Sequence, residues 1–154
     1  MSLSHINERG DAHMVDVSLR EETIRTSTAS ARVNVNKEVL DAIIDNTTPK
    51  GDVLATARIA GILGAKKTSE LIPLCHPIAI HKVEIKVEID ENGVVFFSEV
   101  KTADRTGVEM EALTAVSIAG LTFIDMIKSM DPRAQLTNIQ IESKSGGKNG
   151  SWNR

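Results

Sequence analysis

The sequence predicts an α+β domain in which helices pack on one face of an antiparallel sheet. Two observations lead to this prediction. Strand-like and helix-like segments follow one another in the order strand, helices, two strands, helix, strand, which is typical of a single α+β sandwich. The two central strands are also joined by Asp90-Glu91-Asn92-Gly93, and an Asn-Gly turn is a strong signal for an antiparallel hairpin.

The first half of the chain contains an arm, one strand and two helices. Residues 1–18 mix polar residues, glycine and histidine without strand or helix periodicity, so we predict a mobile arm that a partner could order. Alternation and β-branched residues predict a strand over 23–35, and apolar residues at helical spacing predict a helix over 36–46. After a break at Pro49, a second helix is predicted over 52–67. Asparagine and aspartate at the starts of these helices can cap them.

The second half contains the hairpin, one long helix and a last strand. Strands near 81–89 and 94–102 form the hairpin, and apolar periodicity predicts a helix from about Val108 to Ser129. The stretch 135–143 alternates again and is the last strand, and a flexible tail rich in glycine and lysine follows it. We therefore predict one domain over 19–154 with the architecture of a ferredoxin-like α/β sandwich.

Composition and charge argue against several classes of protein. A chain of 154 residues with 41% hydrophobic residues is long enough to bury one core. Its net charge of -3 and its 3% of aromatic residues argue against general nucleic-acid binding. A single cysteine rules out an internal disulfide and any multi-cysteine metal site. Since no stretch of about 20 apolar residues and no apolar signal segment is seen, we expect a cytoplasmic protein that does not interact with membranes.

The long helix ends with an acid and a base, Asp125 and Lys128, three residues apart. Between Ala112 and Ile124 this helix carries no charge, so we expect it to be buried or to face another subunit. On an exposed helix the pair would be an ion pair worth about 0.2–0.5 kcal/mol. At the end of a buried stripe, burial would perturb both protonation equilibria and make the pair suitable for proton transfer. The spacing leaves both interpretations open.

The segment LIPLCHP places Cys75 and His76 between two prolines that hold the backbone extended. Neighbouring side chains of an extended segment point to opposite sides, so we do not expect these two residues to form a catalytic dyad. His76 and His81 lack the usual spacing of zinc ligands, and we predict no metal site. Cys75 is typical of a small buried residue, whereas His76 is a candidate functional residue.

The segment SKSGGKNG combines glycines with Lys144 and Lys148, a composition that suits phosphate. It is not a Walker loop, because Glu142 stands where the first glycine would be. A flexible tail is the simpler interpretation of this segment. Lys50 is likewise more typical of a surface lysine than of a ligand, so these lysines do not by themselves identify a substrate.

Five segments of the chain together resemble one known family. They are KGDVLATARIAGILGAKKT, LIPLCHP, TGVEMEALTAVSIAGLTFIDMIK, KSGGK and the early HMVDVS. In order and spacing they look like the signature segments of the molybdenum cofactor biosynthesis protein C family, the cyclic pyranopterin monophosphate synthases. The resemblance covers nearly the whole chain.

The resemblance implies a lyase whose small-molecule substrate is derived from a nucleotide. A cyclic dihydroguanosine triphosphate is rearranged to cyclic pyranopterin monophosphate, and pyrophosphate is released. No cofactor is implied as a requirement, although magnesium could accompany the triphosphate. The resemblance also implies a homohexamer that is a trimer of dimers, with active sites at the dimer interface.

The resemblance carries functional roles onto individual positions of this chain. Asp125 and Lys128 match the catalytic acid–base pair of the family. The positions that match substrate-binding or otherwise important residues are Leu74, Cys75, His76, Met110, Glu111, Lys50, Lys144 and Arg25. These residue types fit the reaction, because ring opening and closure move protons and the release of pyrophosphate builds negative charge.

Glu111 and Asp125 are fourteen residues apart, which is difficult to reconcile with one pocket in one chain. On a straight helix this separation is roughly 21 Å, at about 1.5 Å per residue. Either the helix begins after Glu111, or the pocket takes the two residues from different subunits. Two other functions remain possible for the same residues. One is a nucleotide- or pterin-binding module without catalysis, and the other is a structural assembly protein.

Overall fold

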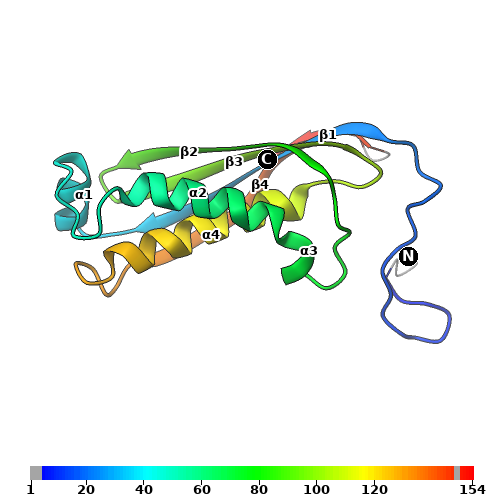
Figure 1. Ribbon diagram of the computed structural model, residues 1–154, viewed down its shortest axis with the longest axis horizontal. Coiled ribbons are helices and arrows are strands. Elements are labelled where there is room, and N and C mark those ends of the chain that lie inside the picture. Colours follow the sequence, from blue (N-terminus) through cyan, green and yellow to red (C-terminus); the bar gives the residue numbers. More distant parts are fainter. Residues whose placement is uncertain (1–4, 148–149) are drawn as a thin grey trace.

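The computed structural model describes residues 5–147 and 150–154, and it confirms the predicted α+β sandwich. One antiparallel sheet has the strand order β2-β3-β1-β4-β5, and Figure 1 shows helices α2 and α4 on one face of it. The strands are β1 (Thr23–Asn34), β2 (Ile80–Asp90), β3 (Gly93–Asp104), β4 (Gln135–Ser145) and β5 (Trp152–Asn153). The helices are α1 (Lys37–Ile44), α2 (Val53–Lys66), α3 (Thr68–Leu71) and α4 (Glu109–Ile127).

The core lies between the sheet and the pair of helices α2 and α4. Phe96 of β3 packs edge-on against Phe123 of α4, with ring centroids 5.8 Å apart. The two helices approach closely, because a Cβ atom on Gly61 of α2 would come within 2.7 Å of the Ala115 carbonyl oxygen in α4. The face of β1 that meets α4 consists of small, fully buried residues, Ala29, Ala31 and Val33. The core therefore fixes α4 against both the sheet and α2.

Several local predictions are confirmed. Asn36 caps α1 by accepting a hydrogen bond from the Val39 N–H at 3.0 Å. Asp52 caps α2 by accepting one from the Ala55 N–H at 2.8 Å. The antiparallel hairpin of β2 and β3 also forms as predicted.

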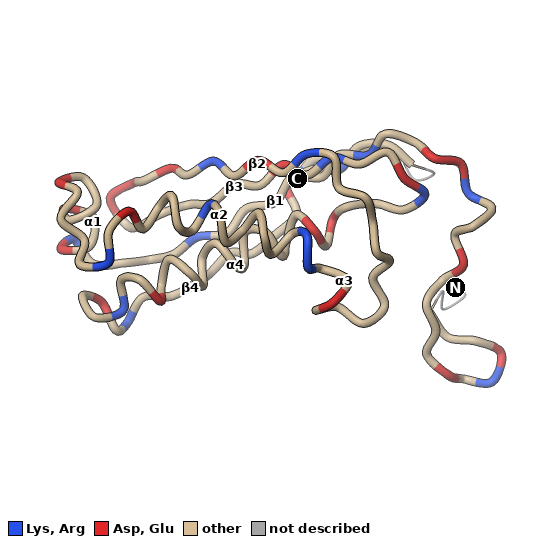
Figure 2. Tube along the Cα trace, in the orientation of Figure 1, with Lys and Arg blue, Asp and Glu red and all other residues tan. Residues whose placement is uncertain are grey.

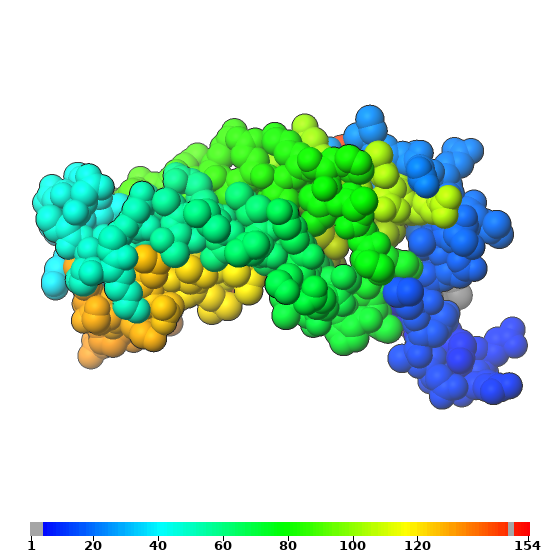
Figure 3. Space-filling view, in the orientation of Figure 1, coloured from blue at the N-terminus to red at the C-terminus, as the bar shows by residue number. Residues whose placement is uncertain are grey.

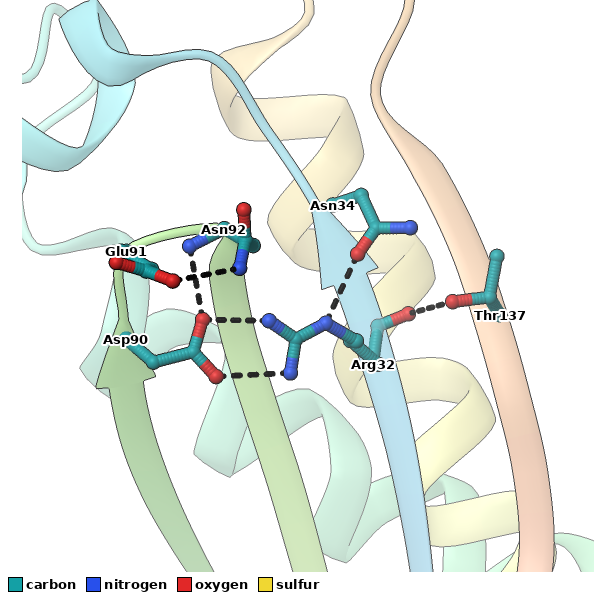
Figure 4. A network of polar contacts seen from close by, with 6 residues as sticks. All are labelled: Arg32, Asn34, Asp90, Glu91, Asn92 and Thr137. Carbon is teal, nitrogen blue, oxygen red and sulfur yellow. Dashed lines mark hydrogen bonds and ion pairs between the residues drawn. The ribbon is translucent and has the colours of Figure 1, made fainter.

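Arg32 of β1 ties together the end of the sheet that carries the hairpin turn (Figure 4). Its guanidinium donates two hydrogen bonds to the Asp90 carboxylate, at 2.5 and 2.8 Å, and Nε donates to Asn34 Oδ1 at 2.9 Å. This contact lowers the pKa of Asp90. The Asn92 N–H also donates to Asp90 at 2.9 Å, and the Thr137 hydroxyl of β4 donates to the Arg32 carbonyl oxygen at 3.4 Å. The network is a structural clasp that joins β1 to the hairpin and to β4.

Short elements and strand ends differ from the prediction. The sequence does not predict α3 or β5, because four residues and two residues are too few to show a period. β4 continues to Ser145, so Lys144 lies in a strand and not in the predicted tail. Lys148 lies outside the described residues. The mobility of the arm and of the tail stays a prediction.

The expectation that no segment is long and apolar enough to cross a membrane is wrong for α4. This helix has 19 residues and meets that test by length and composition alone, and 56% of its apolar window is buried inside the protein. Figure 2 shows that the middle of α4 carries no charged residue. The apolar side chains of α4 instead pack on the sheet and on α2, as in the central helix of a folded domain.

Candidate active site

The predicted site residues form two groups at opposite ends of α4. At the N-terminal end of the helix, one cleft is lined by Leu74, Cys75, His76, Met110 and Glu111. Beyond the C-terminal end, mutual contacts join Lys50, Asp125 and Lys128. Arg25 and Lys144 lie in strands on the side of the first group, because their neighbours Arg20 and Glu109 line the cleft.

The cleft at the N-terminal end of α4 has a volume of about 310 Å³. Three segments that are distant in the sequence build it: the arm, the loop after α3 and the residues that lead into α4. Figure 3 shows the arm, in dark blue, lying against the green segment that follows α3. The cleft therefore depends on a part of the chain that precedes the first strand.

Glu111 is the most deeply buried acid of the cleft, with 3% of its surface exposed. Burial raises the pKa of its carboxyl group to about 7, and the negative charge of Glu109 contributes to the increase. A carboxyl group with such a pKa exists in both protonation states near neutral pH. Glu111 is therefore suited to give or to take a proton.

Cys75 and His76 both line the cleft, although the sequence predicts that they point to opposite sides; a turn closed by the hydrogen bond from the Cys75 N–H to the Ile72 carbonyl oxygen, at 3.0 Å, interrupts the predicted extended segment. Cys75 is only half-buried, which corrects the expectation of a small buried residue, because its side chain lines the cleft. Burial and the charge of Glu111 raise the pKa of the Cys75 thiol, so it stays protonated at neutral pH and is a poor nucleophile. The His76 Nε2 atom lies 2.6 Å from the carbonyl oxygen of Val15 in the arm.

Lys144 reaches the cleft through an ion pair. Its Nζ contacts the Glu109 carboxylate, and both side chains are largely buried. β4 places the lysine there, because Lys144 pairs with Ser27 of the central strand β1. The lysine therefore adds positive charge beside the acids of the cleft, where an anionic group of a ligand would otherwise be repelled.

Arg25 is held next to the glycine-rich segment that follows β4. Its Nε donates a hydrogen bond to the Asp104 carbonyl oxygen at 2.9 Å. Gly147 lies directly against the guanidinium, since a Cβ atom there would come within 2.3 Å of Arg25 Nη1, and its φ of +80° also favours glycine. Arg25 and Arg20 line a second hollow of about 490 Å³ next to the cleft. Glu21 also lines this hollow, so its two arginines give it an excess of one positive charge, which favours an anion.

The second group of residues is an open cluster. Lys128 Nζ lies 2.6 Å from Asp125 Oδ1, and Lys50 Nζ lies 2.9 Å from the Asp125 carbonyl oxygen and 3.5 Å from Oδ2. The exposed fractions of the side chains are 46% for Lys50, 60% for Asp125 and 61% for Lys128. The hydrogen bond from Lys128, assisted by the charge of Lys50, lowers the pKa of Asp125.

These values correct the idea that burial perturbs the pair. In one chain, Asp125 and Lys128 lie at the C-terminal end of α4 with more than half of each side chain exposed, and Lys50 contacts Asp125 there. Lys128 is the C-cap residue of the helix and not part of its last turn. An apolar stripe does not by itself bury its last residues, because burial at a helix end depends on which segments pack around that end.

The continuous helix also decides how far apart the two groups are. α4 contains both Glu111 and Asp125, so the alternative that the helix begins after Glu111 is wrong. At about 1.5 Å per residue, the two positions are roughly 21 Å apart along the helix axis. The cleft and the open cluster of one chain therefore cannot contact the same small reacting ring.

Sequence reasoning missed several residues that line the cleft. Glu109 was not selected, although it stands in the segment GVEME beside two selected residues. Val15, Val17 and Arg20 come from the arm and its continuation toward β1. Only the motif HMVDVS pointed to this region, because a segment without periodicity gives no signal of where it packs.

Metal binding has no obvious basis in the described residues. Over 5–147 and 150–154, no group of three or more histidine, cysteine, aspartate or glutamate side chains is arranged to hold a metal ion. A magnesium ion that arrives with a triphosphate stays a prediction, since phosphate oxygens would supply several of its ligands.

Comparison with known proteins gives one consistent answer. The model of the MoaC family matches residues 14–147. A protein of Streptomyces avermitilis named cyclic pyranopterin monophosphate synthase is 53% identical over 152 residues, which cover 99% of this chain and 89% of the relative. Proteins of the same name from Nocardioides sp. and Thermomicrobium roseum are 51% and 49% identical; each alignment covers 99% of this chain and 95% and 93% of the respective relative.

The match extends over both groups of site residues. It includes the loop that carries His76, the whole of α4 and the strand that carries Lys144. The family resemblance noted in the sequence is thus confirmed over residues 14–147, which include part of the arm and all of the chain from β1 to the end of β4. This chain belongs to the MoaC family.

Proposed function

We propose that the chain converts a cyclic dihydroguanosine triphosphate to cyclic pyranopterin monophosphate and pyrophosphate, in the biosynthesis of the molybdenum cofactor. The observation that carries this proposal is membership of the MoaC family, whose relatives here are named for the synthesis of that product. The reaction needs groups that move protons and groups that stabilise phosphate charge. The two ends of α4 supply both kinds.

The proposed roles follow from the surroundings of each side chain. Forming the cyclic monophosphate joins a hydroxyl oxygen to the α-phosphorus, breaks the bond from that phosphorus to pyrophosphate and leaves the hydroxyl proton for a base. Glu111, with a pKa of about 7, and the Asp125–Lys128 pair are the proton-transfer groups of the proposal. Arg25 and Lys144 stabilise the negative charge of the phosphates.

The proposed active site combines two subunits, because one chain cannot bring both ends of α4 together. One partly exposed side of α4 carries the stripe Met110, Leu113, Ser117, Leu121 and Ile124. Met110 and Leu121 are exposed, Leu121 by 54%, whereas the other three are partly buried. The stripe's spacing of three or four residues is the pattern that packs against another helix. The small residue Ser117 lies at the centre of the stripe.

A two-fold axis at Ser117 would join two antiparallel copies of α4. Met110 then lies level with Ile124 of the other copy, and Leu113 with Leu121. The same register places Glu109 level with Asp125 of the other subunit, so that each cleft gains an Asp125–Lys128 pair. The Ser117 hydroxyl already donates to the Leu113 carbonyl oxygen at 2.8 Å, so it needs no partner in an apolar contact. The trimer of such dimers, magnesium with the triphosphate and location in the cytoplasm stay predictions.

Incubation with the cyclic triphosphate tests the proposal. We expect stoichiometric release of pyrophosphate and formation of a pterin that becomes fluorescent on oxidation. A binding module would bind the substrate and return it unchanged, and a structural assembly protein would not bind it. Either of these results with the wild-type protein would contradict the proposed activity.

A further inference from the structure

The described part of the chain before β1, from residue 5 onward, has internal contacts and reaches the cleft. Asn7 Oδ1 accepts hydrogen bonds from the Arg9 and Asp11 N–H groups, at 2.9 Å each, and Ile6 forms a β-bridge with Ala12. These contacts close the first part of the arm into a compact loop. Beyond the loop, Val15, Val17 and Arg20 line the cleft together with His76 and Glu111. The arm is thus a wall of the cleft, and Figure 3 shows it lying against the segment that follows α3.

One short hydrogen bond joins the arm to His76, whose ring can both donate and accept protons. His76 Nε2 lies 2.6 Å from the Val15 carbonyl oxygen. A carbonyl oxygen can only accept, so Nε2 must carry the hydrogen. If the ring is neutral, Nδ1 then has a free lone pair, and if the ring is charged, Nδ1 carries the second hydrogen. In both states the proton that changes is the one at Nδ1.

We propose that the arm positions His76 for the reaction. The Val15 carbonyl group accepts the hydrogen of Nε2, so that only Nδ1 of the ring is available to contact the substrate. This inference rests on the proposed function for the nature of the substrate. Among the described residues, no hydrogen bond of Nδ1 to the protein is formed. The neutral ring therefore offers an acceptor to an N–H or hydroxyl group of the substrate and can take its proton.

The loop that carries His76 explains why a positioning contact is needed. Residues 72–79 form neither helix nor strand, so no regular backbone ladder restrains the ring. An imidazole has two chemically different nitrogens, and without a partner both neutral tautomers are populated. The contact with Val15 removes that ambiguity and fixes the plane of the ring. Other ionisable groups that line the cleft are His5, Arg20, Cys75, Glu109 and Glu111.

Nitrogen-15 NMR of the full-length protein labelled at histidine tests the tautomer without any substrate. We expect His76 to show a protonated Nε2 and an unprotonated Nδ1 when its ring is neutral. His81 is an internal reference, because its Nδ1 accepts from the Ala103 N–H at 3.3 Å and its ring must have the same tautomer. The His76 signals are identified by their loss in His76→Gln. A hydrogen on Nδ1 of the neutral His76 ring, or an equal mixture of tautomers, would overturn the proposal.

Two variants separate the roles of the two ring nitrogens. In His76→Gln, the side-chain amide nitrogen takes the place of Nε2 and can still donate a hydrogen bond to the Val15 carbonyl oxygen. In His76→Asn, the amide nitrogen takes the place of Nδ1, and the hydrogen bond to Val15 is lost. We expect His76→Gln to retain the protection of amides 13–18 from hydrogen exchange and to lose about 10²-fold or more in turnover, the range of a general acid or base. We expect His76→Asn to lose the protection of the arm.

The outcomes distinguish this inference from the proposed function. Turnover of His76→Gln within tenfold of the wild type would show that Nδ1 does no chemistry. Equal arm protection in His76→Asn and the wild type would show that the Val15 contact does not hold the arm. Unfolding temperatures of both variants report whether the domain remains folded. Failure of the wild type to release pyrophosphate would refute the proposed function alone, because the NMR and exchange results need no turnover.

Discussion

The two ends of α4 carry acids with opposite properties. At the N-terminal end, Glu111 is buried and its pKa is raised to about 7. At the C-terminal end, Asp125 is exposed and the hydrogen bond from Lys128 lowers its pKa. One helix therefore presents one carboxyl group that can hold a proton at neutral pH and another that cannot. The difference shows that the environment of each end, and not the residue type, sets the proton chemistry.

The two ends of α4 also differ in how far the protein surrounds them. The buried end lies in a cleft that the arm helps to line, whereas the open end is a cluster of charged groups that are about half exposed. An exposed ion pair contributes little to stability, so the structure of one chain gives the Asp125–Lys128 pair no strong structural purpose. A second subunit that covers the open end would shield the Asp125–Lys128 pair from solvent and place it where it can transfer protons.

The largest expected effect comes from removing the exposed pair. We expect Asp125→Ala and Lys128→Ala each to reduce turnover by about 10²–10⁴-fold, the range of general acid–base catalysis. Both side chains are exposed in one chain, so the unfolding midpoint at fixed protein concentration should change little. Steady-state kinetics and thermal unfolding measure the two quantities. If both variants kept more than a tenth of wild-type turnover, Asp125 and Lys128 would form an ordinary surface ion pair. The control is Lys37→Ala, which breaks another exposed ion pair.

A charge in the middle of the partly exposed stripe on α4 should separate the two subunits that would share an active site. We expect Ser117→Lys to give monomers by light scattering and about 10²-fold lower activity, because burying an unpaired lysine costs several kcal/mol. Ser117→Ala is the matched control and should keep both the assembly and the activity. A monomeric Ser117→Lys protein with full activity would show that each chain has a complete site of its own.

The buried acid should reveal itself in the pH dependence of stability. The pKa of Glu111 is about 7 in the folded protein and near 4.5 when the group is unperturbed, so the folded state binds more protons between these values. The free energy of unfolding of the wild type should therefore fall, relative to Glu111→Gln, as pH rises from 4.5 through 7. The loss should be at most about 3 kcal/mol.

Urea unfolding of both proteins between about pH 3.5 and pH 8 measures this effect, because these limits lie roughly one unit outside the window. Glu88→Gln, at an exposed position of β2, is the matched control and should follow the wild type. A constant difference between Glu111→Gln and the wild type across this range would mean that Glu111 titrates like an exposed acid.

The smallest expected effect concerns the phosphates. Removing one charged hydrogen bond should raise KM about tenfold. We expect this for Lys144→Ala if the cleft end binds phosphate, together with a weaker dependence of KM on salt, since one screened attraction is lost. Lys50→Ala, at the open end, should instead lower kcat. The opposite assignment of the two lysines would place the phosphates at the open end.

The sequence predicted the fold well where periodicity was strong. The strands 23–35 and 94–102 and the helix that starts near Val108 agree with the structure within a few residues. The absence of charge in the middle of α4 also made its burial predictable. α3 and β5 were missed because such short elements have no measurable period.

The candidate site was only partly predictable. Family resemblance identified Glu111, Asp125 and Lys128, but their burial followed from segments that pack around each end of α4, and periodicity does not report such contacts. The arm shows the same limit, since nothing in its residue pattern indicates that Val15 meets His76. The separation of Glu111 and Asp125 along α4 is the one feature of the site that sequence spacing did predict. The prediction that Glu111 and Asp125 are too far apart for one pocket follows from helix geometry once the helix is known to be continuous.

The central claim is that each active site combines the buried end of one α4 with the open end of another. Refolding a mixture of Glu111→Ala and Asp125→Ala subunits tests it directly, with subunit exchange verified by mass spectrometry of labelled chains. With random pairing, half the dimers are mixed, and each mixed dimer contains one intact site and one doubly defective site. We predict that two inactive variants regain about a quarter of wild-type activity. Verified exchange without any gain of activity would contradict the claim, because both residues would then serve the same subunit.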